Sequence, residues 1–129
     1  MNDLAKAWLD ELRSGKYEQG RGQLRKGDAY CCLGVASELY RRTYGKGHWK
    51  ENDSGDLLFS IGGESEVGIL PIRVRDALGL DDSEGSYYND ENKLTSLVLK
   101  NDNVATFAEI ADIIESEPAG LFVEKEASP

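Results

Sequence analysis

GRGQLRKGDAYCCLGVASELY, residues 20–40, is the stretch of sequence that decides the fold. The apolar residues that follow Tyr30 recur at the spacing of one helix face, which predicts a mostly buried helix. Gly34 falls inside this helix, where glycine costs about 1 kcal/mol relative to alanine. We therefore expect Gly34 to pack closely against another backbone. The alternative is that residues 29–33 are extended and that the helix begins near Gly34.

A basic, glycine-spaced loop precedes the predicted helix. Gly20 and Gly22 flank Arg21, and Arg25 and Lys26 follow. The glycines permit positive φ and close backbone approach. Free N–H groups and the dipole at a helix start attract anions, and the planar fork of arginine suits phosphate. The loop therefore predicts a site for a phosphorylated ligand, unless its arginines pair with carboxylates of the second half of the chain.

Aromatic residues surround this loop and complete the candidate ligand-binding set. Tyr17 and Tyr30 lie on either side of it, and aromatic rings can stack on a base. The loop that contains His48 and Trp49 is a candidate second wall. The alternative for Trp49 is a partly buried side chain that anchors its own loop. The predicted ligand is a small nucleotide-like molecule.

Size, charge and hydropathy limit the function classes. A chain of 129 residues, 40% hydrophobic and 30% charged, predicts one globular domain over residues 1–129. The net charge of −9, divided as +4 on residues 1–50 and −13 on residues 51–129, disfavours binding to duplex nucleic acid. No apolar run approaches the roughly 20 residues that span a bilayer. The N-terminus also lacks the apolar segment of a signal peptide, which predicts a cytoplasmic protein.

The predicted helices and strands are segregated along the chain, which predicts an α+β fold with about five helices around a central helix and one or two short β-hairpins. Runs at 57–61 and 66–70, separated by Gly-Gly-Glu-Ser, predict a hairpin. The other predicted elements are helices near 3–13, 71–78, 94–100 and 107–116, loops at 45–56 and 81–92, an edge strand at 121–123 and a loose tail at 124–129.

Three helix starts carry capping signals. Thr106 followed by Glu109 matches a capping box, in which side chains and backbone satisfy each other's free groups. Asn2 or Asp3 is the predicted cap of the first helix. Asp28 is a candidate cap or turn residue ahead of the helix after Tyr30.

The sequence predicts no catalytic constellation, no metal site and no cofactor. Cys31 and Cys32 are adjacent, and a thiolate nucleophile would need a base, for which His48 is the only histidine. We expect both cysteines to be reduced and at least one of them to be packed as a small apolar residue. Two adjacent cysteines and one histidine lack the spacing of a zinc site. The acidic loops at 53–56 and 81–84 are interpreted as solvated, although a carboxylate pair for hydrolysis stays open.

Several blocks of the sequence carry a family resemblance. They are Trp8, YCCLGV at 30–35, LPIRVRDALGL at 70–80 and FAEIADIIE at 107–115. Together they resemble a family of small proteins encoded by tailed bacteriophages and prophages, from which this chain departs at Leu99–Asp102. The resemblance implies a phage origin, the cytoplasm of an infected bacterium, and an accessory protein that acts on host machinery or host defence.

We therefore predict a non-enzymatic, anti-defence accessory protein that binds and sequesters a small nucleotide signal, with a pocket completed at a homo-oligomer interface. Two alternatives stay open. One is an acidic protein–protein inhibitor that uses residues 51–129 against a host nuclease or another nucleic-acid-binding enzyme. The other is a small hydrolase that uses Cys31 or a carboxylate pair. Its turnover would be lost in Cys31→Ser.

Overall fold

A computed structural model describes residues 1–103 and 105–124 of the chain. The α+β class and the five helices are confirmed for these residues, while the eight strands exceed the one or two hairpins predicted. The elements are α1 (Asp3–Arg13), β1 (Glu18–Gln19), β2 (Arg25–Lys26), β3 (Ala29–Tyr30), α2 (Cys32–Tyr44), β4 (His48–Glu51), β5 (Leu57–Ile61), β6 (Glu64–Glu66), α3 (Ile72–Leu78), β7 (Ser86–Tyr88), β8 (Leu94–Ser96), α4 (Leu97–Asn103) and α5 (Phe107–Glu115).

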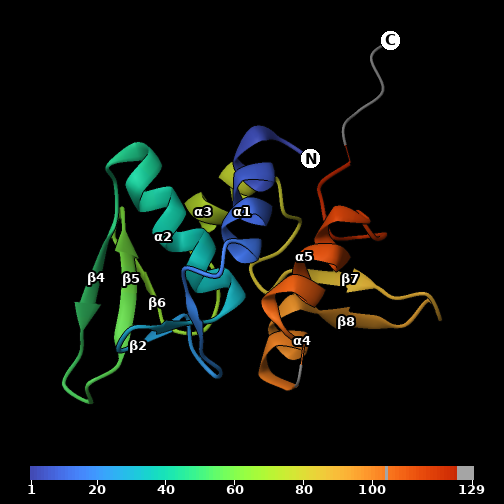
Figure 1. The fold of residues 1–129 in the computed structure, drawn as a ribbon. Helices are drawn as coiled ribbons and strands as arrows, with labels where there is room; N and C mark the ends of the chain where they lie inside the picture. Colours follow the sequence, from blue (N-terminus) through green and yellow to red (C-terminus); the bar gives the residue numbers. More distant parts are fainter. Residues whose placement is uncertain (104, 125–129) are drawn as a thin grey trace, which may run out of the picture.

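The strands form two separate sheets. The larger sheet has the order β1-β3-β2-β5-β4, with β6 also paired to β5, and all its pairings are antiparallel except β1 with β3. The smaller sheet is the antiparallel pair β7–β8. Figure 1 shows the larger sheet at the left, the β7–β8 ribbon at the right with α4 and α5, and the helices α1, α2 and α3 between them.

Helix α2 begins at Cys32 because of two local features. Cys31 has extended backbone angles, and its Sγ accepts a hydrogen bond from the Gly34 N–H at 3.4 Å. A Cβ built on Gly34 would lie 1.8 Å from the carbonyl oxygen of Leu24. The predicted close backbone contact is therefore confirmed, and the alternative start near Gly34 is wrong. Asp28 does not cap this helix; it lies in the turn between β2 and β3.

The core lies where α1, α2 and α5 meet. Trp8 is fully buried, and its Nε1–H donates to the carbonyl oxygen of Cys32 at 2.9 Å. Both predicted capping signals on the outer helices are confirmed, because Asn2 caps α1 and Thr106 forms a capping box with Glu109. The other large side chains that are fully buried are Phe59, Leu24, Leu33, Leu70, Leu78, Leu80, Leu97, Ile110, Ile114, Leu121 and Val35.

One buried side chain joins distant parts of the chain. Asn101, which is fully buried on α4, accepts hydrogen bonds from the Cys32 N–H at 3.1 Å and from Gln19 Nε2 at 3.0 Å. Its Nδ2 donates to the Gly20 carbonyl oxygen at 2.8 Å. The carboxylate of the neighbouring Asp102 accepts from the Gly22 N–H at 2.9 Å. The basic loop is therefore tied to α4 through its backbone.

Several predicted loops and boundaries are wrong. The predicted loop at 45–56 contains β4, because its residues pair with β5. The predicted loop at 81–92 contains β7, and β8 precedes α4 where a helix was expected. In place of an edge strand at 121–123 there is an isolated bridge between Leu80 and Phe122. The part of the predicted tail at 125–129 lies outside the described residues.

Candidate anion-binding site

The backbone donors of the basic loop are already occupied. The Gly20 N–H donates to the carbonyl oxygen of Tyr30 at 2.7 Å, and the Gly22 N–H donates to Asp102. At the start of α2, the Cys32 N–H donates to Asn101. The donors that were expected to receive a phosphate are therefore engaged by the protein itself, and one of their partners is a carboxylate.

The cations of the same loop do not converge on a cavity. The guanidinium of Arg25 lies 5.1 Å from the ring centroid of Tyr30 and 5.5 Å from that of Trp49, and its Nε donates to the carbonyl oxygen of Gly27 at 2.7 Å. Arg21 and Lys26 are exposed and have no ion pair among the described residues. Neither of them lines any of the three cavities described for the protein.

The predicted aromatic residues come together, but they stack on one another. Tyr17 packs edge-on to Tyr30 with ring centroids 5.2 Å apart, and Tyr30 packs on Trp49 at 5.9 Å. Trp49 then packs on Phe59 at 5.1 Å. Their faces are therefore used within the fold, and the structure favours the alternative in which Trp49 anchors its own segment.

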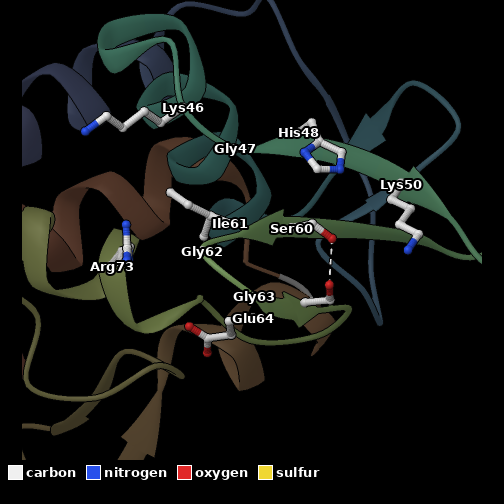
Figure 2. A pocket seen from close by; sticks show the side chains of 11 residues that line it. Lys46, Gly47, His48, Lys50, Ser60, Ile61, Gly62, Gly63, Glu64 and Arg73 are labelled. Atoms are coloured by element: carbon white, nitrogen blue, oxygen red, sulfur yellow. Dashed lines mark hydrogen bonds between the residues drawn. The ribbon is translucent and has the colours of Figure 1, made fainter.

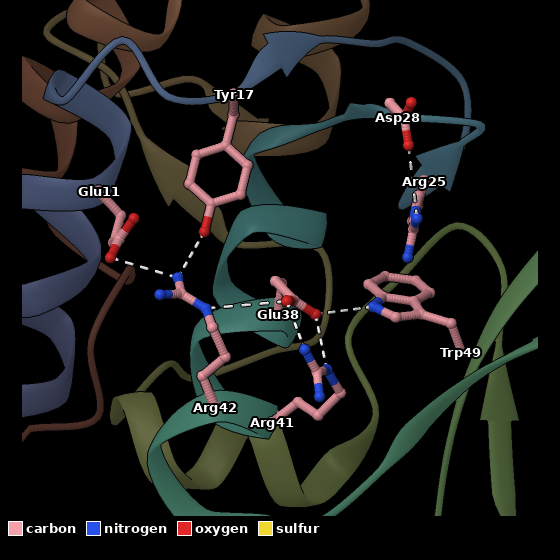
Figure 3. A network of polar contacts seen from close by, with 8 residues as sticks. All are labelled: Glu11, Tyr17, Arg25, Asp28, Glu38, Arg41, Arg42 and Trp49. Carbon is pink, nitrogen blue, oxygen red and sulfur yellow. Dashed lines mark hydrogen bonds and ion pairs between the residues drawn. The ribbon is translucent and has the colours of Figure 1, made fainter.

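A network of charged side chains fixes Trp49 against α2 (Figure 3). Glu38 accepts hydrogen bonds from Trp49 Nε1 at 3.0 Å and from Arg41 at 2.7 and 2.8 Å. Arg42 extends the network to Glu11, 3.2 Å away, and donates to the hydroxyl of Tyr17. Because Trp49 belongs to β4, this network also fixes the position of that strand.

The network has a defined dependence on pH. Burial would raise the pKa of Glu38, but the hydrogen bonds from Arg41 and Trp49 outweigh burial and leave this pKa below its ordinary value of 4.5. A lowered pKa in the folded state means that the carboxylate stabilises the fold above the unfolded pKa. This stabilisation is lost as the pH falls through the folded value.

We expect Glu38→Gln to lower the free energy of unfolding by about 2 kcal/mol at pH 7, because charge-assisted hydrogen bonds are lost. The difference from the parent should shrink as the pH falls below about 4.5, because the unfolded parent then takes up a proton that the folded carboxylate binds only at lower pH. Urea unfolding at pH 7 and pH 3.5 measures both values. The matched control is Glu51→Gln on exposed β4. An equal loss at both pH values would contradict this role of the carboxylate.

A cavity of about 590 Å³ lies around the Gly62–Gly63 turn at one end of the same sheet (Figure 2). It is built from the segment that precedes and includes β4, the β5–β6 hairpin, and the first turn of α3. His48 is thus the one predicted site residue that lines it. The full lining is Lys46, Gly47, His48, Lys50, Ser60, Ile61, Gly62, Gly63, Glu64, Ser65 and Arg73.

The strand register explains why these side chains share a face. His48 pairs with Ser60, and Ser60 pairs with Ser65 on the other side of β5, so all three point to the same side of the sheet. The two Ser hydroxyls are hydrogen-bonded at 2.6 Å. Alternation along β4 sends Lys50 to the cavity face and Trp49 to the other. Along β4, Trp49 and the aromatic cluster therefore lie on one face of the strand, and His48 and Lys50 lie on the other.

Glycines shape one wall of the cavity. The two residues between β5 and β6 are Gly62 and Gly63, with φ of +57° and +86°, and such a turn requires left-handed backbone at both positions. A Cβ on Gly62 would lie 2.8 Å from the guanidinium carbon of Arg73. The guanidinium therefore packs directly against the glycine backbone, which holds it at the cavity.

The cavity carries an excess of positive charge. Lys46, Lys50 and Arg73 line it, and none of them forms an ion pair with a described residue. The one carboxylate in the lining belongs to Glu64, and it accepts a hydrogen bond from the Ile72 N–H at 2.8 Å. The acidic residue is thus engaged at the start of α3, while the cations remain available to an anion.

The buried cysteines do not offer a nucleophile. Cys31 is 5% exposed and Cys32 is fully buried. Burial raises the pKa of Cys31 to about 11 and raises that of Cys32 well above its ordinary value, so both thiols stay protonated at neutral pH. Both cysteines have structural roles: Cys31 caps α2, and Cys32 is packed in the core. Among the described residues there is also no cluster of three or more side chains suited to a metal ion.

The chain belongs to a family described as Domain of unknown function (DUF8296), whose model matches residues 1–118. Searches of curated proteins and of solved structures found no match. The matched range includes every residue that lines the cationic cavity and all five described helices. Within the described part of the chain, no helix has the length and apolar character needed to cross a membrane.

Proposed function

We propose that this protein binds and sequesters a small phosphorylated ligand in the cationic cavity lined by Lys46, His48, Lys50 and Arg73. In this proposal it is a phage-encoded accessory protein that removes a nucleotide signal of host defence in the bacterial cytoplasm. The observation that carries the proposal is a cavity lined by three cations that form no ion pair with a described residue, and by a single carboxylate.

The cavity suits a phosphate better than the basic loop does. Three cations supply charge, and the hydrogen-bonded Ser60–Ser65 pair has one hydroxyl proton left that can be donated to a phosphate oxygen. Arginine held flat against a backbone is preorganised for bidentate contact with phosphate oxygens. Its volume of about 590 Å³ also lies within the range typical of small-ligand sites. We therefore place the proposed ligand in this cavity and not beside Arg21, Arg25 and Lys26.

Two matched pairs of variants test the position of the site. We expect Lys50→Gln and Arg73→Gln each to weaken nucleotide binding about tenfold, because each removes a charged hydrogen-bond donor. Lys26→Gln and Arg21→Gln change the same residue types in the basic loop and should leave affinity unchanged. Calorimetric titration of the four variants with a panel of linear and cyclic nucleotides measures these affinities. Loss of binding only in the basic-loop variants would move the site back to that loop.

The two alternatives receive less support. The acidic-inhibitor proposal needs a free acidic surface on the second half of the chain, and two of its carboxylates on α5 are not free, because Arg13 pairs with Asp112 at 2.8 Å and with Glu115 at 2.9 Å. The hydrolase proposal through Cys31 needs a thiolate, which the raised pKa of that residue opposes. We also propose that α2 is the central helix of the fold, since it packs against α1, α3 and α4.

A further inference from the structure

We infer that the cationic cavity recognises a contiguous chain of phosphates and does not read a nucleobase. This inference rests on the proposed function and specifies its ligand class. The expected ligands are nucleoside triphosphates and inorganic oligophosphates. Cyclic dinucleotides, whose phosphates are separated by sugars, are not expected to fit the same contacts.

The first argument is the absence of a stacking surface in the cavity. Proteins hold the bases of single strands largely by stacking them on aromatic faces. Among the eleven lining residues the only ring is the imidazole of His48. The aromatic residues of the same two strands, Trp49 and Phe59, pair directly with each other and point to the opposite face of the sheet. A base in the cavity would therefore meet lysine and glycine, not an aromatic ring.

The second argument is the position of the charges. Figure 2 shows Lys46 and Arg73 at one end of the cavity, and His48 and Lys50 at the other, with the Gly62–Gly63 turn between the two ends. A row of adjacent phosphates can contact cations at both ends at once. A single phosphate offers fewer oxygens to these cations, so we expect its affinity to be much lower.

The third argument is the chemistry of the middle of the cavity. No hydrogen bond is described for the backbone N–H of Gly62 or Gly63, which lie outside the strands. Successive N–H groups at such turns are common binding elements for anions. The hydrogen-bonded hydroxyls of Ser60 and Ser65 lie beside them and have one proton left to donate to a further oxygen. The centre of the cavity therefore offers donors, and the carboxylate of Glu64, which keeps its charge, accepts a hydrogen bond from the Ile72 N–H of α3.

Calorimetry with sodium tripolyphosphate, ATP, GTP, AMP, adenosine and cyclic di-AMP, in the absence of divalent cations, tests the inference on the full chain. We expect tripolyphosphate, ATP and GTP to bind with dissociation constants within about threefold of one another. AMP should bind at least about tenfold more weakly, and adenosine and cyclic di-AMP should not bind. Lys50→Gln should weaken all three strong ligands by a similar factor, and Lys26→Gln should weaken none.

The outcomes separate the inference from the proposed function. Binding of cyclic di-AMP or AMP without binding of tripolyphosphate would overturn the phosphate-chain inference and leave the proposed function standing. A preference above tenfold between ATP and GTP would also overturn it, because the site would then read the base. If none of the phosphorylated probes binds, the proposed function fails and the inference fails with it.

Discussion

Gly34→Ala is expected to lower the free energy of unfolding by at least about 3 kcal/mol, and the variant is expected to be largely unfolded at 37 °C. The new Cβ would lie 1.8 Å from the carbonyl oxygen of Leu24 and 2.7 Å from its carbonyl carbon. These are backbone atoms, so no side-chain rotation can relieve the overlap. Helix α2 would have to move away from the segment that leads into β2.

The matched control is Gly68→Ala. Gly68 has no positive φ, and a Cβ there would meet no atom within 4 Å. The control should stay within about 0.5 kcal/mol of the parent. Urea unfolding followed by tryptophan fluorescence compares the three proteins, because Trp8 contacts α2 directly. Equal stabilities of Gly34→Ala and Gly68→Ala would show that the close backbone contact does not exist.

Asn101→Ala is expected to cost about 3 kcal/mol of stability. The change removes a fully buried amide and leaves the Cys32 N–H and the Gly20 carbonyl oxygen without partners. Each unsatisfied buried polar group costs about 1–3 kcal/mol. The change also leaves Gln19 with only its bond to the carbonyl oxygen of Ala105, so the loop that precedes α2 should loosen.

Asn103→Ala on the same helix is the control, because Asn103 is exposed and has no described hydrogen bond from its side chain. Urea unfolding gives the two stabilities, and hydrogen exchange of the amides at 20–34 locates the effect. Asn101→Ala should speed exchange in that segment, whereas Asn103→Ala should not. An unfolding free energy within 0.5 kcal/mol of the parent in Asn101→Ala, with unchanged exchange, would contradict the joining role of Asn101.

Local physical signals in the sequence were sufficient to predict several structural features. A glycine inside an apolar helix pattern predicted a backbone contact, and Gly34 makes one. The Thr106–Glu109 spacing predicted a capping box, and both reciprocal hydrogen bonds are present. The capping box depends only on residues within one turn of helix. The Gly34 contact follows from the cost of placing a glycine inside a helix, which a close backbone contact explains. The sequence therefore contains all the information that they require.

The cavity could not be predicted in the same way. Its lining comes from the segment before β4, from β5, from the Gly62–Gly63 turn and from α3, and no spacing in the sequence links Lys46 to Arg73. Residues 48–51 are polar and follow two glycines, so they resemble a loop; only pairing with β5 makes them a strand. His48 was nevertheless included among the predicted ligand-binding residues, and it does line the cavity.

The basic loop shows why a glycine-rich pattern alone is ambiguous. Glycines beside an arginine expose N–H groups that can receive a phosphate, and the same groups can receive a carboxylate of the protein. Here the Gly22 N–H donates to Asp102, a residue eighty positions later in the chain. Arg25 likewise stacks on Tyr30 and Trp49. Which partner is used depends on long-range packing, which local sequence does not encode.

The most direct test of the central claim is a ¹H–¹⁵N NMR titration of the full chain with ATP. If the cationic cavity binds phosphate, the amides of His48, Gly62 and Gly63 should shift in a saturable way, and those of residues 20–26 should stay in place. Shifts confined to residues 20–26, or no shifts at millimolar ATP, would contradict a phosphate site in the cavity between β4, the β5–β6 turn and α3.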